Sequence, residues 1–103
     1  MIIVEGWVKL AAGELDKLRE TALWMMEKTR KEEGCELYVY STELENPDVM
    51  RISERWASPA ALEAHGNSAH MAKFNEAMGK AQILGISVKA YTAEAGRTLI
   101  GGD

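Results

Sequence analysis

The sequence is poor in cysteine, histidine and proline, and it contains no long apolar run. The single cysteine, Cys35, excludes an intrachain disulfide and fits a reducing compartment. No segment approaches the roughly 20 apolar residues that a membrane span needs, and the N-terminal residues lack the basic and apolar regions of a signal peptide. We therefore expect a cytoplasmic protein with no membrane partner.

Several functional motifs are also missing. Lys and Arg number 12 against 16 Asp and Glu, and this net charge of −4, without a basic stripe, makes nucleic acid an unexpected partner. The chain has neither a glycine-rich phosphate loop nor a Gly-x-Ser-x-Gly nucleophile motif. Two histidines and one cysteine are too few for an ordinary zinc site, so no metal is expected.

What the sequence does contain is one small domain of alternating strand and helix patterns. Its 103 residues suit a single domain, which we place at 1–95, followed by a tail at 96–103. Period-two and period-3.6 apolar patterns set the element boundaries. They predict strands at 2–10, 35–44, 49–57 and 84–95, and helices at 12–33, 59–65 and 69–80.

This order of elements predicts an α+β fold, a four-stranded antiparallel sheet with helices packed on one face. Gly34 is expected at the C-terminal end of the long helix, and the strands at 35–44 and 49–57 should form a hairpin. The other face of the sheet carries apolar residues whichever way each strand faces: either Trp7 or Val8, and either Tyr38 or Val39. A two-fold partner would cover that surface, so we predict a homodimer.

The candidate site begins on the strand at 49–57, where Glu54 alternates with apolar residues on one face. A carboxylate facing an apolar layer needs a partner. His65 follows Leu62 by three residues on the inward side of the short helix and could meet Glu54. A carboxylate bound to one ring nitrogen fixes the tautomer and makes the other nitrogen a better general base. The alternative is a purely structural pair that ties the helix to the sheet.

Three more residues have two interpretations each. His70, near the start of the last helix, could cap that helix or line a pocket. Asn75 could donate a hydrogen bond to a substrate oxygen or lie on a solvated flank. Trp56 could form the wall of a pocket or belong to the core.

The same region resembles the antibiotic biosynthesis monooxygenase family. The matching residues are Glu54-x-Trp56-x-Ser58, then Ala61-Leu62-x-Ala64-His65, then Ser68-x-His70-Met71. Glu32-Glu33-Gly34-Cys35 is similar to members of the quinol monooxygenase type, and the resemblance covers residues 2–95.

The resemblance implies a dimeric, ferredoxin-like α+β barrel with a pocket between sheet and helices in each subunit. It implies oxygenation of a quinol, anthrone or polycyclic phenol by O₂ without flavin, haem or metal, because the deprotonated substrate itself supplies electrons to O₂. His65 would then be the proton acceptor and Glu54 would orient it. The residues expected to contact the substrate are Trp56, His70, Met71, Phe74 and Asn75.

Two branches of this fold give alternatives. The haem-degrading branch has an Asn on the first strand, a Trp in the short helix and a His on the last helix, and this chain lacks that pattern, so haem degradation is disfavoured. An isomerase of small phosphorylated signalling sugars is the second enzymatic alternative, although Lys73 and Arg55 form no obvious phosphate cradle. The abundance of methionine keeps open a non-catalytic dimer that binds a small apolar molecule.

Overall fold

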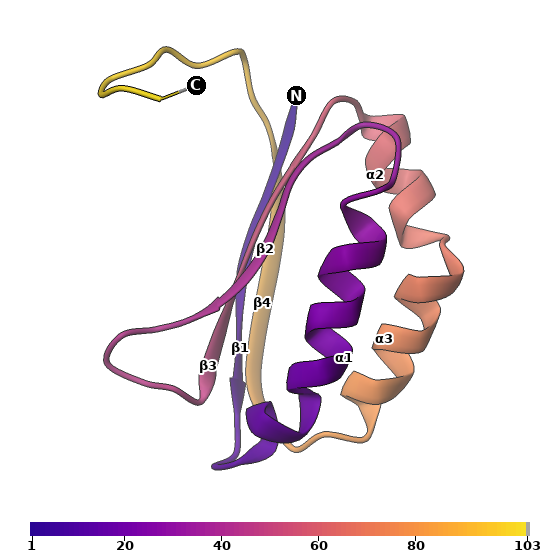
Figure 1. Cartoon of the computed structure of the whole chain (residues 1–103), viewed down its shortest axis with the longest axis vertical. Coiled ribbons are helices and arrows are strands. Elements are labelled where there is room, and N and C mark those ends of the chain that lie inside the picture. Colours follow the sequence, from indigo (N-terminus) through magenta and orange to yellow (C-terminus); the bar gives the residue numbers. More distant parts are fainter. Residues whose placement is uncertain (103) are drawn as a thin grey trace.

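A computed structural model describes residues 1–102. It contains one layer of four strands and one layer of three helices (Figure 1). The elements in chain order are β1 (Ile2–Leu10), α1 (Glu14–Thr29), β2 (Cys35–Thr42), β3 (Val49–Trp56), α2 (Pro59–Gly66), α3 (Ala69–Gly79) and β4 (Ile83–Thr92).

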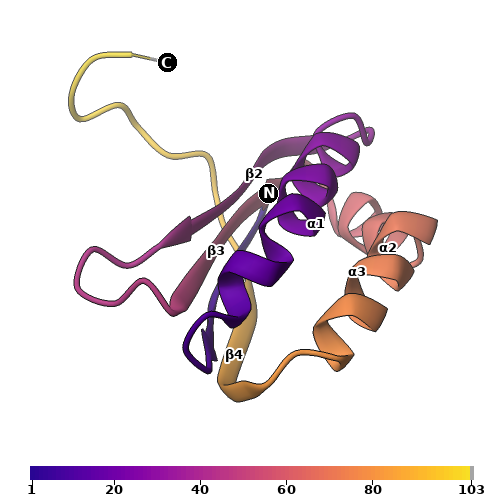
Figure 2. The same ribbon diagram turned by 60° about the horizontal axis from the view of Figure 1, so that its bottom comes forward.

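The four strands form one antiparallel sheet in the order β2-β3-β1-β4, and all three helices lie on the same side of it (Figures 1 and 2). This is the ferredoxin-like α+β arrangement, and it confirms the predicted fold class. The hairpin of β2 and β3 is also confirmed. Within the described residues, none of the helices has the length and apolarity that crossing a membrane would require.

The core lies between the sheet and the helices and follows the alternation of the strands. On β3 the residues Met50, Ile52, Glu54 and Trp56 are all buried, as the sequence predicted. Tyr38 pairs with Glu54 across the β2–β3 ladder and is buried on the same side. Neighbours in register point to the same face, so Trp7 and Val39 belong to the opposite face, which we call the open face.

Helix α1 ends earlier than the sequence predicted. It stops at Thr29 with Arg30 as its C-cap, so the expected extension to residue 33 and the expected role of Gly34 at the helix end are wrong. The amides of Lys31 and Glu32 bond to carbonyls three residues back, which tightens the chain into a turn before β2. Gly34, at φ +82°, completes this turn.

The two shorter helices begin where the sequence predicted. Ser58 and Ser68 are their N-caps, and each hydroxyl accepts a hydrogen bond from the amide three residues later at 3.2 Å. After β4 the chain leaves the sheet on its open side (Figure 1). Asp103, the last residue of the expected tail at 96–103, lies outside the described residues, and the domain boundary at residue 95 remains a prediction.

Candidate active site

A cavity of about 340 Å³ lies between the sheet and helices α2 and α3. Its walls are mainly apolar, with one carboxyl, one imidazole, one carboxamide and one ammonium group among them. The lining residues are Val4, Glu54, Leu62, His65, Gly66, Met71, Asn75, Val88, Lys89 and Ala90. A few polar groups converging in an apolar hollow are typical of small-molecule sites.

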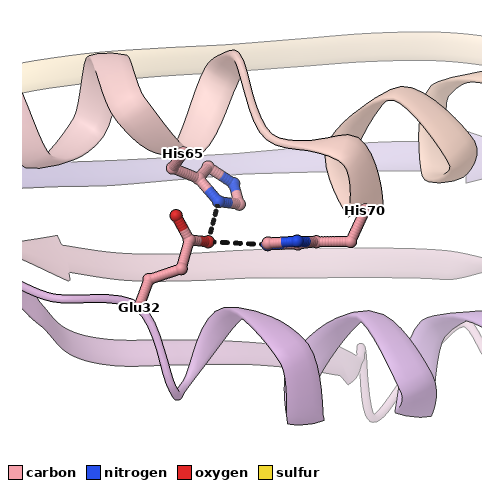
Figure 3. A group of neighbouring side chains, drawn as sticks. All are labelled: Glu32, His65 and His70. Carbon is pink, nitrogen blue, oxygen red and sulfur yellow. Dashed lines mark hydrogen bonds and ion pairs between the residues drawn. The ribbon is translucent and has the colours of Figure 1, made fainter.

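His65 reaches this cavity from the last turn of α2 and is only 4% exposed. Its ring lies over the indole of Trp56, with centroids 4.8 Å apart, and meets Tyr38 edge-on at 5.2 Å. Its Nδ1 is 2.7 Å from Oε2 of Glu32, in the turn after α1 (Figure 3). Packing and hydrogen bonding together therefore fix the orientation of the imidazole.

Glu32 binds a second imidazole through the same oxygen. Nε2 of His70, in the first turn of α3, is 2.8 Å from Glu32 Oε2 (Figure 3). An ionised carboxylate only accepts hydrogen bonds, so Nδ1 of His65 and Nε2 of His70 must carry the protons. In the neutral His65 ring, Nε2 then keeps its lone pair, and no group of the described residues is hydrogen-bonded to it.

Glu54 has a different partner from the one that the sequence predicted. Its Oε1 accepts a hydrogen bond of 2.9 Å from Nε1 of Trp56, two residues further along the same face of β3. The expected hydrogen bond between Glu54 and His65 is therefore wrong: Glu54 is bonded to the indole of Trp56, and His65 is bonded through Nδ1 to Glu32. Burial raises the pKa of the Glu54 carboxyl, and the Trp56 hydrogen bond and His65 partly oppose that increase.

Comparison with known proteins agrees with this fold. The family model for antibiotic biosynthesis monooxygenase matches residues 1–77. The chain belongs to the antibiotic biosynthesis monooxygenase family. No curated protein matches it at a significant level.

Solved structures of the same fold include several assigned to this family. A provisionally assigned antibiotic biosynthesis monooxygenase from Deinococcus radiodurans is 26% identical, with a TM-score of 0.90 over 98% of this chain and 100% of its own. Another such protein, from Caulobacter crescentus, is 22% identical, with a TM-score of 0.84 over 91% of this chain and 90% of its own. A protein from Mycobacterium tuberculosis is 21% identical, with a TM-score of 0.83 over 94% and 98%. The last two show the fold alone.

In this member of the antibiotic biosynthesis monooxygenase family, the expected substrate-binding residues separate into three groups. Met71 and Asn75 line the cavity. Trp56 and Phe74 are core residues, the first fully buried beneath His65 and the second stacked on Tyr40. His70 neither caps α3 nor lines the cavity, because Ser68 provides the cap and Glu32 binds the imidazole.

The residue that sequence reasoning missed is Glu32. The family-like segment Glu32-Glu33-Gly34-Cys35 marked its position, but helix periodicity placed it inside α1 and assigned it no role. With Glu32 included, three groups that can bind a metal ion lie close together: its carboxylate and the imidazoles of His65 and His70. Cys35 is close in sequence and half-buried, and burial, Glu32 and Glu54 all raise its pKa, which disfavours the reactive thiolate.

Proposed function

We propose that this protein is a cofactor-independent monooxygenase that oxidises a quinol, an anthrone or a polycyclic phenol with O₂. The observation that carries the proposal is the environment of His65. Glu32 holds its Nδ1–H, which leaves Nε2 as a proton acceptor in a ring that lines a largely apolar cavity. Membership of the monooxygenase family supports the reaction class.

The cavity suits a flat organic substrate. Its volume of about 340 Å³ is within the range of small-molecule pockets. Val88 of its wall is 47% exposed, and Ile86, two residues earlier on the same face of β4, is 57% exposed. These side chains extend the apolar wall beyond the cavity, so a substrate of two or three fused rings has apolar surface to lie on.

The proposed reaction needs little chemistry from the protein. His65 Nε2 accepts the acidic proton of the substrate, and the resulting anion transfers one electron to O₂. Recombination gives a peroxide, and loss of water from it leaves a carbonyl, so that an anthrone CH₂ group and O₂ become C=O and H₂O. Asn75 donates a hydrogen bond to a substrate oxygen, and the apolar walls exclude water.

The test is oxygen uptake with reduced naphthoquinones and anthrones. We expect His65→Ala to lower kcat by about 10²–10⁴-fold, which is the usual contribution of a general base. Glu32→Gln should lower kcat less, because it leaves the base in place and weakens only its orientation. Glu33→Gln is the matched control for Glu32→Gln: it removes the same charge from the adjacent, exposed residue, which does not line the cavity, so kcat should stay close to that of the wild type.

Two outcomes would contradict the proposal. Equal rates for wild type and His65→Ala would remove His65 from the mechanism. A ligand that raises the melting temperature without any oxygen uptake would favour the non-catalytic binding dimer instead. The sugar-phosphate isomerase has little support, because Lys73 and Arg55 lie outside the cavity lining and Lys89 is the only cationic residue in it.

We also propose that the protein acts as a homodimer in the cytoplasm. The apolar residues on the open face support the dimer. The single cysteine supports a reducing compartment.

A further inference from the structure

Glu32, His65 and His70 bring three metal-binding atoms together from three separate segments. One ligand atom of each residue lies within 4.8 Å of the others, and Oε2 of Glu32 is 2.7 Å from Nδ1 of His65 and 2.8 Å from Nε2 of His70 (Figure 3). The side chains of Glu32 and His70 are 17% and 18% exposed, which gives an ion in solution access to the cluster. Neither Glu32 nor His70 lines the cavity, so the substrate does not need this space.

The chemistry of these atoms selects the class of ion. Two imidazoles and one carboxylate suit late first-row divalent metals such as Zn²⁺ and Co²⁺, whereas Mg²⁺ and Ca²⁺ prefer oxygen ligands alone. Both imidazoles can remain neutral on binding, because each can move its proton to its other ring nitrogen. One carboxylate and two neutral rings would then face the cation, with water in the remaining coordination positions.

The geometry requires only a local adjustment. Metal–ligand distances of about 2.0–2.2 Å place neighbouring ligand atoms of a tetrahedral site about 3.3 Å apart. The two hydrogen bonds, at 2.7 and 2.8 Å, are shorter than that, and the upper limit of 4.8 Å for the cluster is longer. Glu32 lies in a turn outside α1, so rotation of its side chain can redistribute these distances without moving a helix.

We propose that Glu32, His65 and His70 form a binding site for a divalent late transition-metal ion. The metal would replace the two protons now shared with Glu32 and would leave His65 Nε2 protonated. If the proposed function is correct, metal binding would therefore inhibit it, because His65 could no longer accept a proton. That consequence rests on the proposed function, but the metal site itself does not.

The test is direct binding of Zn²⁺ to chelator-treated protein by calorimetry, with Co²⁺ absorption spectra as a second measurement. We expect one ion per chain and, for Co²⁺, visible bands typical of mixed nitrogen and oxygen ligands. His70→Ala and Glu32→Gln should each weaken Zn²⁺ binding by more than about tenfold, since removing even an outer-shell partner costs that much. Glu33→Gln removes the same charge from the adjacent, exposed residue and should leave binding unchanged.

His70→Gln makes the result independent of folding, because its carboxamide can still donate to Glu32 while binding metals poorly. It should keep the melting temperature of the wild type and lose Zn²⁺ affinity. The proposal is overturned if wild-type protein does not bind Zn²⁺, or if the histidine variants bind it as tightly as the wild type. Neither result would affect the oxygenase proposal, which the His65→Ala oxygen-uptake measurement tests separately.

Discussion

Glu54 is a buried carboxyl group whose only hydrogen bond from a described residue comes from an indole. Burial raises its pKa above the ordinary value of 4.5, so folding favours the protonated form. Glu54 therefore lowers the free energy of unfolding at high pH. This loss of stability is absent below pH 4.5 and grows as pH rises through the higher folded-state pKa. Glu54→Gln keeps an acceptor for Trp56 Nε1 and removes the ionisation.

We therefore expect Glu54→Gln to be more stable than the wild type at pH 7.5, with the difference shrinking as pH falls towards 4. Urea unfolding of both proteins at several pH values measures this. Because the prediction concerns a difference between two proteins, the titration of other groups largely cancels. A difference that does not change with pH would contradict the conclusion that folding raises the pKa of the Glu54 carboxyl.

The partners of single residues were the least predictable feature of the site. Burial of Glu54 and His65 followed from strand and helix periodicity, and both side chains do line one cavity. Their hydrogen bonds did not follow, because Glu32 and Trp56 compete for the same groups at distances that spacing alone does not specify. A residue in a turn belongs to no periodic pattern, so periodicity could not predict that the Glu32 carboxylate contacts two imidazoles.

At the scale of elements, the turn between α1 and β2 determines where Glu32 lies. A Cβ atom on Gly34 would be 2.6 Å from Cβ of Ala61 in α2, so this glycine lets the turn pack directly against the helix that carries His65. Gly13, before α1, has nearly the same backbone angle, φ +81° against +82°, but its Cβ would meet nothing within 4 Å. Substituting each glycine in turn therefore distinguishes the cost of backbone strain from the cost of steric contact.

Gly13→Ala should cost about 1 kcal/mol of unfolding free energy, from the left-handed conformation alone. Gly34→Ala should cost about 1–3 kcal/mol more, from overpacking against Ala61, and should displace the turn that carries Glu32. Chemical denaturation gives both values. Equal losses in the two variants would mean that the turn relaxes freely and does not depend on close contact with α2.

Elements were predictable where local chemistry marks their ends. The first strand at 2–10 and the starts of α2 and α3 agree with the structure, because β-branched runs and serine caps are local signals. Helix α1 was predicted too long at both ends, since its lysines and glutamates favour helix beyond the point where the chain must turn back to the sheet. That error concealed the position of Glu32.

At the scale of the whole molecule, the open face of the sheet leaves apolar side chains in water. Ile3 and Tyr91 are neighbours across β1 and β4 and are 36% and 46% exposed. The chain after β4 lies on the same side and exposes Leu99 and Ile100 (Figure 1). A second copy related by a two-fold axis would cover both groups at once, and a domain this small gains proportionally more from such burial than a larger one.

Light scattering after size exclusion should accordingly give twice the chain mass of 11.4 kDa. Ile3→Lys should shift the protein towards monomer, because it places a second cation beside Arg55, its neighbour in register, in the surface that must be dehydrated. Leu44→Lys makes a comparable change at a fully exposed residue of the β2–β3 loop and should leave the mass unchanged. A monomeric wild type at high micromolar concentration would refute the dimer, and the apolar open face would then need another partner.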